Sequence, residues 1–110
     1  MRLPSTFRFI DDTSRNEFLA LKDGDDADKK LYQWIYAAGA ALEQNAHAGT
    51  HIQKRLIPKE YARHRIDNLW KYNLPEGWRL LYTITNDEVI ILTIVLEWLD
   101  HKNYEQRFKY

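Results

Sequence analysis

Residues 69–84 read LWKYNLPEGWRLLYTI, and this stretch decides the fold because it joins two strand patterns through a short turn. Pro75 and Gly77 predict the turn, since proline fixes φ at its start and glycine accepts a positive φ at its end. Before the turn, Arg65 to Leu74 alternate between apolar and polar, apart from Leu69, and after it Trp78 to Ile84 alternate again. A period of two is typical of β-strands, so we predict a β-hairpin here.

The hairpin predicts which side chains share a face. If residues 75–77 form a three-residue loop, Asn73 faces Arg79, and Lys71 lies diagonally opposite Arg79 at about 7–8 Å. Two cations and an amide on one strand pair would suit a phosphate, because arginine can hold two of its oxygens at once. A bulge in the loop would shift this register by one position. The alternative, that Lys71 and Arg79 are ordinary solvated residues of an antiparallel sheet, stays open.

Upstream of the hairpin the pattern is helical, with one short strand in front. Residues 7–10 alternate well enough for a first strand, and residues 11–14 offer N-caps for a short helix. A longer helix, capped by Asp25 or Asp26 and ended by Gly49, is indicated by apolar residues at helical spacing: Leu31, Trp34, Ile35, Ala38, Ala41 and Leu42. Residues 52–58 form a basic connection, closed by Pro58, whose conformation the pattern does not determine.

Downstream of the hairpin, Thr85 to Glu88 predict a second turn. Val89 to Leu96 is apolar on both faces apart from Thr93, which is typical of a central, doubly covered strand. A length of 110 residues predicts a single domain spanning residues 1–110. The predicted fold class is therefore α+β: an N-terminal helical hairpin packed on a small antiparallel sheet, made of the short first strand and a C-terminal three-stranded meander.

The composition of the chain limits the classes of protein and of catalysis to which it can belong. Hydrophobic residues make up 45% of the chain, which is enough for a core and argues against disorder. The absence of cysteine excludes disulfides and thiolate catalysis and fits a reducing compartment. The first residues lack the apolar run of a signal peptide, and no stretch approaches the roughly 20 apolar residues of a membrane helix. We therefore expect a cytoplasmic protein with no membrane partner.

The formal net charge is zero, from 16 basic and 16 acidic residues, but the charges are distributed unevenly. Residues 11–28 contain six Asp and one Glu against two basic residues, whereas between residues 50 and 79 Lys and Arg clearly outnumber three acidic residues. Nucleic-acid binders usually need a basic region, because phosphate contacts dominate their affinity. No metal site is indicated, since Gly49 separates His47 from His51 and the glutamate of a zinc-protease helix is missing.

The C-terminal segment is a second candidate for chemistry. His101, Tyr104 and Phe108 recur at i, i+3 and i+7, on one face of a helix that Asp100 can cap. Histidine titrates near neutrality and can transfer protons, while tyrosine can stack on an unpaired base or donate a proton. The alternative is an ordinary amphipathic terminal helix with one exposed histidine. For Glu97, just before this segment, a structural salt bridge is the expected role.

These segments, read in order, resemble the RelE/ParE toxin superfamily. In that family a strand with basic residues precedes a Trp/Tyr-Arg-x-x-Tyr strand, as in Asn68–Ile84, and a last strand, here Val89–Leu92, leads to a histidine–tyrosine tail, here His101–Tyr104. The connection Gly49–Leu56 is also similar to the Gly-x-x-Ile-x-Lys-x-Leu pattern of the family. The likeness extends over roughly Leu31 to Tyr110, and the order and spacing of the motifs carry it.

The resemblance implies the toxin of a type II toxin–antitoxin pair, a metal-independent endoribonuclease without cofactor that cleaves mRNA, typically on the ribosome. It also implies a cognate antitoxin, whose acidic amphipathic segment would wrap the toxin and neutralise its basic face. By this resemblance Arg79 would stabilise the phosphate, His101 would act as acid or base, and Tyr104 would stack or donate a proton. Further contacts to RNA would come from Lys71, Asn73 and Arg107.

Two features depart from the family pattern, namely the neutral net charge and an acidic N-terminal segment that is longer than expected. Two other functions therefore stay open. A ParE-like inhibitor of DNA gyrase shares the fold but lacks the RNA-cutting tail pair, and a non-toxic interaction module would retain only the scaffold. The presence of His101 and Tyr104 favours the nuclease.

Overall fold

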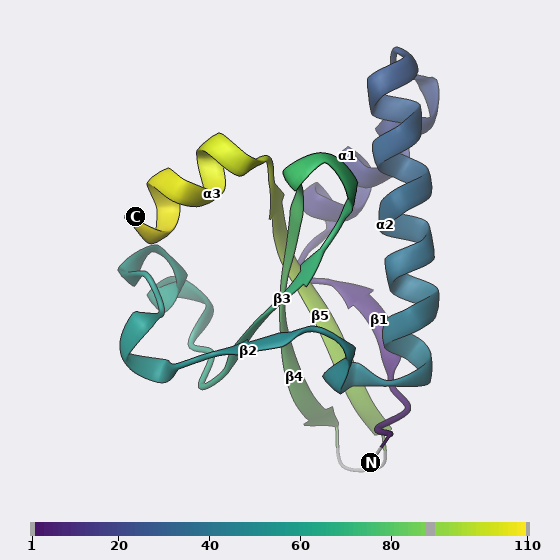
Figure 1. Cartoon of the computed structure of the whole chain (residues 1–110). Coiled ribbons are helices and arrows are strands. Elements are labelled where there is room, and N and C mark those ends of the chain that lie inside the picture. Colours follow the sequence, from purple (N-terminus) through teal and green to yellow (C-terminus); the bar gives the residue numbers. More distant parts are fainter. Residues whose placement is uncertain (1, 88–89, 110) are drawn as a thin grey trace.

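The computed structural model describes residues 2–87 and 90–109, which form a sheet covered by helices on both faces (Figure 1). The helices are α1 (Asp12–Ala20), α2 (Asp26–Gln44) and α3 (His101–Phe108). The strands are β1 (Thr6–Phe9), β2 (Thr50–Ile52), β3 (Leu69–Asn73), β4 (Arg79–Asp87) and β5 (Ile90–Leu99). Short 3₁₀ segments lie at Leu21–Asp23, Ala46–Ala48, Lys54–Leu56, Lys59–His64 and Pro75–Gly77.

The five strands follow the order β1-β5-β4-β3-β2, with β1 parallel to β5 and the other pairs antiparallel. The predicted α+β class is confirmed, and so is the hairpin register, because Asn73 pairs with Arg79. The sheet differs from the prediction in two details, the parallel direction of β1 and the additional strand β2. An alternating pattern shows which residues face a core but not which way a strand runs, and a strand of three residues is too short to show a period.

The start of β3 was predicted too early. Arg65 has a left-handed backbone conformation with φ of 53°, which an extended strand excludes. The side chain of Asn68 then takes the place of a strand residue opposite β4. Its amide group donates to the carbonyl oxygen of Ile84 and accepts from the N–H of Ile84, each at 2.9 Å. Regular pairing therefore begins only at Leu69.

The second hairpin is longer than predicted. Thr85 to Asp87, predicted as a turn, are strand residues that pair with Leu92, Ile91 and Ile90. β5 also continues to Leu99, beyond the predicted end at Leu96. The last residue of the predicted turn, Glu88, and the predicted first strand residue, Val89, lie outside the described residues.

Aspartates begin the helices, as the sequence predicted. The side chain of Asp11 accepts from the N–H of Ser14 at 2.8 Å at the start of α1. That of Asp25 accepts from the N–H of Asp28 at 2.9 Å at the start of α2. Each carboxylate satisfies a backbone donor that the first helical turn leaves unpaired.

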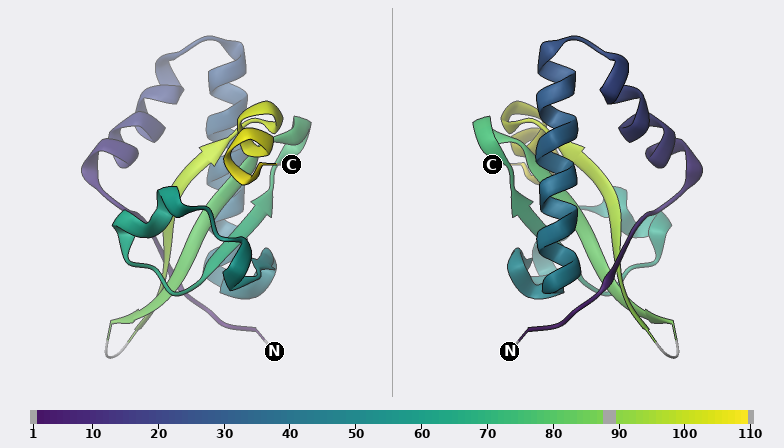
Figure 2. Two further views of the ribbon diagram at one scale, coloured as in Figure 1. Left: turned by 90° about the vertical axis from the view of Figure 1, so that its left-hand side faces the viewer. Right: turned by 90° about the vertical axis from the view of Figure 1, so that its right-hand side faces the viewer.

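The two faces of the sheet bury two separate cores. Figure 2 shows α2 across one face of the sheet and α3 across the other. On one face α1 and α2 enclose Phe18, Leu31, Ile35, Ala38, Leu42, Leu74, Leu80, Tyr82 and Val95. On the other, α3 and the 3₁₀ segments around Tyr61 enclose Ile52, Tyr61, Leu69, Leu81, Leu96 and Tyr104. Lys71 and Arg79 lie on this second face. Lys71 pairs with Leu81, which belongs to the second core, and Arg79 precedes Leu80, whose side chain points into the first core.

A bulge in β5 changes the face of the sheet to which the Glu97 side chain points. Leu81 pairs with Glu97 and Tyr82 with Val95, so Leu96 is an extra residue without a partner on β4. In a regular strand Glu97 would point to the same face as Val95, toward α2. The extra residue turns it instead to the face of Leu81, where α3 lies.

Gly49 allows the chain just before β2 to pass close to Lys71 and Tyr82. We expect its replacement by alanine to lower the stability of the fold. A Cβ there would lie 2.4 Å from the carbonyl oxygen of Lys71 and 2.6 Å from the hydroxyl of Tyr82. That hydroxyl accepts from the N–H of Gly49 and donates to Ala46, so neither neighbour can move freely. Gly49→Ala should lower the free energy of unfolding in urea by about 1–3 kcal/mol.

Ala48→Ser is the matched control, because it adds one atom to the exposed neighbour of Gly49. We expect a change within about 0.5 kcal/mol. Equal stability of Gly49→Ala and Ala48→Ser would contradict the close approach of the chain at Gly49 to Lys71 and Tyr82.

Candidate functional site

The hairpin and α3 bring two cations onto one tyrosine ring. Lys71 on β3 and Arg79 on β4 lie on the same face, as the sequence predicted. The Nζ of Lys71 lies 5.3 Å from the centroid of the Tyr104 ring, and the Cζ of Arg79 lies 5.1 Å from it. Both distances fit cation–π contacts. The ring thus holds two positive charges at one place on the sheet.

Arg79 retains an unused hydrogen-bond donor. Its terminal NH1 group donates to the carbonyl oxygen of Gly77, in the turn that precedes β4. Its Nε is buried and has no hydrogen-bond partner among the described residues. A buried donor of this kind is uncommon, because leaving it unpaired costs about 1–3 kcal/mol. An anionic oxygen could satisfy this Nε only after the groups that cover it had moved.

His101 lies at the same turn. Its Cβ is 3.0 Å from the position that a Cβ on Gly77 would occupy, and Gly77 has a positive φ of 81°. Its side chain is 62% exposed, and its Nε2 is 2.9 Å from a carboxylate oxygen of Glu105, one helical turn along α3. Arg79 and His101 therefore both contact Gly77 and lie at one end of the sheet.

Tyr104 is a core residue of α3. Asp100 caps this helix by accepting from the N–H of Asn103 at 2.9 Å, as predicted. The Tyr104 side chain is 2% exposed and stacks on Phe108, with 4.5 Å between ring centroids. With Phe108 beside it and cations over it, the ring can stack on an RNA base only if α3 shifts. Its place supports a role in holding Lys71 and Arg79.

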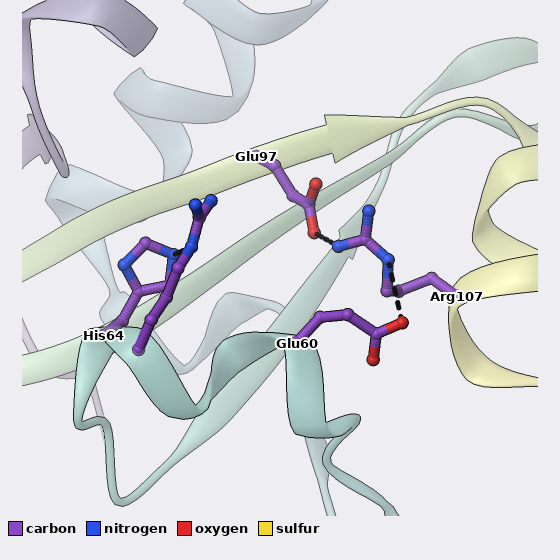
Figure 3. A network of polar contacts seen from close by, with 5 residues as sticks. Glu60, His64, Glu97 and Arg107 are labelled. Carbon is purple, nitrogen blue, oxygen red and sulfur yellow. Dashed lines mark hydrogen bonds and ion pairs between the residues drawn. The ribbon is translucent and has the colours of Figure 1, made fainter.

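Arg107 lies apart from these residues. Its guanidinium bonds to Glu97 and is 4.0 Å from Glu60 (Figure 3). It also lies over the ring of Tyr61, 5.7 Å from the ring centroid. The predicted salt bridge of Glu97 is therefore confirmed. The structure does not bring Arg107 to the Lys71–Arg79 pair, since two carboxylates already hold it. Asn73 is exposed at the end of β3, opposite Arg79.

Two buried tyrosines make the fold sensitive to alkali. Burial raises the pKa of Tyr82 to about 12, and burial beside Glu97 also raises the pKa of Tyr61. In the unfolded chain tyrosine titrates near 10, so the stability that these groups contribute is complete below pH 10 and is lost as the pH rises toward 12. Urea unfolding between pH 9 and 11 should show a falling free energy.

The control for this prediction is Tyr82→Phe. The variant should be less stable at pH 8, because it loses two hydrogen bonds, but its stability should fall less steeply above pH 10. Tyr36→Phe, at an exposed ring, should keep the wild-type slope. Equal slopes for all three proteins would exclude Tyr82 as a source of the pH dependence.

Sequence reasoning missed two features of this region. One is a hollow of about 260 Å³ between β2 and α3, lined by Thr50, His51, Ile52, Gln53, Leu56, Lys71, Tyr104 and Phe108. The other is the indole of Trp70, which stacks on His47 at 5.1 Å and meets the edge of His51 at 5.0 Å. Neither has a signal in linear spacing, because both depend on where β2 pairs.

Within residues 2–87 and 90–109, no group of three or more histidine or acidic side chains is placed to hold a metal ion. Over the same residues, no helix has both the length and the apolar surface to cross a membrane.

A helical hairpin on this five-stranded sheet, with a cationic β-hairpin under the C-terminal helix, has the architecture of the RelE/ParE toxins. A sequence model described as "ParE toxin of type II toxin-antitoxin system, parDE" matches residues 8–96. The chain belongs to this family and is the toxin of a type II toxin–antitoxin system, which implies a cognate antitoxin partner. Comparisons with curated proteins and with solved structures gave no match.

Proposed function

We propose that this toxin is an endoribonuclease that cleaves mRNA at the end of the sheet where Arg79, Lys71 and His101 lie. The two cations that meet on the Tyr104 ring, with His101 at the same turn, are the observation that carries the proposal. A guanidinium beside a second cation is suited to the charge that develops on a phosphate during attack. The site of action would be the cytoplasm, on mRNA and with the ribosome as a partner.

The reaction would be an attack by the ribose 2′-hydroxyl on the adjacent phosphorus. A base removes the 2′-hydroxyl proton, the O2′–P bond forms, and the P–O5′ bond breaks as an acid protonates the leaving O5′. His101 is the candidate for one of these proton transfers, because imidazole titrates near neutrality and its side chain is exposed. Arg79 and Lys71 would neutralise the negative charge on the pentacoordinate phosphorus. Tyr104 would hold both cations in place.

His101→Gln tests the proton transfer. It should lower the rate of RNA cleavage about 100-fold or more, because a positioned acid or base contributes about 10²–10⁴-fold to such a step. The measurement is single-turnover cleavage of a labelled RNA by protein made in a cell-free system, with and without translating ribosomes. Gln106→Ala is the matched control, since it changes an exposed neutral residue of α3, leaves His101 and its partner Glu105 in place, and should keep the wild-type rate. A full wild-type rate in His101→Gln would remove this residue from the mechanism.

The second candidate is inhibition of DNA gyrase without catalysis. The match to the ParE toxin model favours it, because that match ends at residue 96 and so includes the hairpin but not α3, with His101 and Tyr104. A supercoiling assay with purified gyrase separates the two functions. Inhibition of supercoiling together with intact RNA would replace the nuclease proposal, whereas RNA cleavage with normal supercoiling would support it.

A further inference from the structure

We propose that the hollow between β2 and α3 binds one base of the RNA beside the cleaved phosphate, and that it sets the base preference of the toxin. This inference rests on the proposed function and deepens it. Lys71 belongs both to the wall of this hollow and to the cation pair on Tyr104. A nucleotide whose phosphate met Lys71 would therefore place a neighbouring base at the hollow.

The lining of the hollow fits a base. Its apolar part comes from the exposed Leu56 and from Phe108 on α3, together with the buried Ile52 and Tyr104. Polar groups come from the Thr50 hydroxyl and the Gln53 amide, both of them exposed. A base has apolar faces and a polar edge, so protein sites for single-stranded RNA combine apolar or aromatic contacts with a few hydrogen-bonding groups. The volume of about 260 Å³ lies just below the roughly 300–1,000 Å³ of ordinary ligand pockets, which suits an occupant no larger than one base.

Charge also favours RNA as the occupant. None of the described lining residues is acidic, and the neighbouring segment carries the exposed cations Lys54 and Arg55. A hollow of similar size on the other side of α3 has both signs of charge in its lining, with Arg63 and Arg107 beside Glu60 and Glu97. There Arg107 is already paired with the two carboxylates, which would also repel a phosphate backbone. The first hollow has a lysine and no acidic residue in the lining that the structure describes, and so suits RNA better.

Two substitutions at the hollow test the inference. Leu56 is 52% exposed, so Leu56→Trp should fill the hollow without disturbing the core, and Gln53→Ala should remove an amide that can read a base edge. Cleavage of a random-sequence RNA pool is followed by sequencing of the product ends. We expect both variants to change the base preference at one position next to the cleaved bond by about tenfold. Ala37→Trp, at an exposed site on α2, is the matched control and should leave the preference unchanged.

A binding experiment separates failure of this inference from failure of the nuclease proposal. The four nucleoside 5′-monophosphates are titrated into the labelled wild-type protein, and backbone amide shifts are followed by NMR. Shifts at residues 50–56 that Leu56→Trp abolishes would support the base site even if no RNA were cleaved. Cleavage with an unchanged preference in both variants, or no shifts in this segment, would overturn the inference while leaving the catalytic residues in place.

Discussion

Arg79→Ala should lower the rate of RNA cleavage by about 100- to 1000-fold, the usual effect of removing a donor that stabilises charge in a transition state. The guanidinium is set on the sheet by its bond to Gly77 and by the ring of Tyr104, so it needs little reorganisation when charge develops on the phosphate. Growth arrest on expression should be lost as well. The rate is measured in single-turnover reactions with protein synthesised in a cell-free system, since the wild type is expected to be toxic.

Three controls show whether a loss of rate in Arg79→Ala comes from the missing guanidinium. Arg79→Lys retains a charge but not the planar group of donors, so it should recover only part of the rate. Arg8→Ala removes an exposed arginine from β1, away from the hairpin, and should leave the rate unchanged. Urea unfolding shows whether the variants remain folded, because Arg79 also contacts Tyr104. Cleavage by a folded Arg79→Ala protein at the wild-type rate would exclude Arg79 from catalysis.

The hairpin could be predicted from the sequence because its information is local. Asn73 and Arg79 are separated only by the turn, so the loop length fixes their register, and alternation then puts Lys71 on the same face. The caps of α1 and α2 were predictable for the same reason, since each aspartate acts on a donor three residues away. The strand residues of the candidate site, Lys71, Asn73 and Arg79, could therefore be placed from the local sequence alone.

The other half depends on contacts between distant segments. The spacing of His101 and Tyr104 suggests one helical face, but it does not reveal that Tyr104 is buried against the hairpin while His101 remains exposed. Arg107 shows the same limit. Whether it meets RNA or carboxylates depends on a bulge at Leu96, which turns Glu97 toward α3, and no period in the sequence marks that extra residue. The hollow beside β2 required the position of a strand that alternation could not predict.

Tyr104→Ala should have the largest effect on stability, with a loss of about 3–5 kcal/mol in the free energy of unfolding. The ring is almost fully enclosed, stacks on Phe108, and belongs to the one buried residue that the structure describes in α3. Without it, α3 loses its anchor on the sheet, and Lys71 and Arg79 lose the surface that orients them. Cleavage should therefore fall together with stability, and urea unfolding at pH 7 measures the second effect directly.

Tyr104→Phe separates packing from proton donation, the two roles that this residue can have. Phenylalanine keeps the stacked ring and the cation–π contacts, so a positioning role predicts stability within about 1.5 kcal/mol of the wild type and a cleavage rate within about tenfold. A proton-donating hydroxyl predicts instead a loss of about 100-fold or more in a protein that stays folded. We expect the first outcome, because a ring that is 2% exposed and covered by two cations is placed to arrange the site rather than to meet the leaving oxygen.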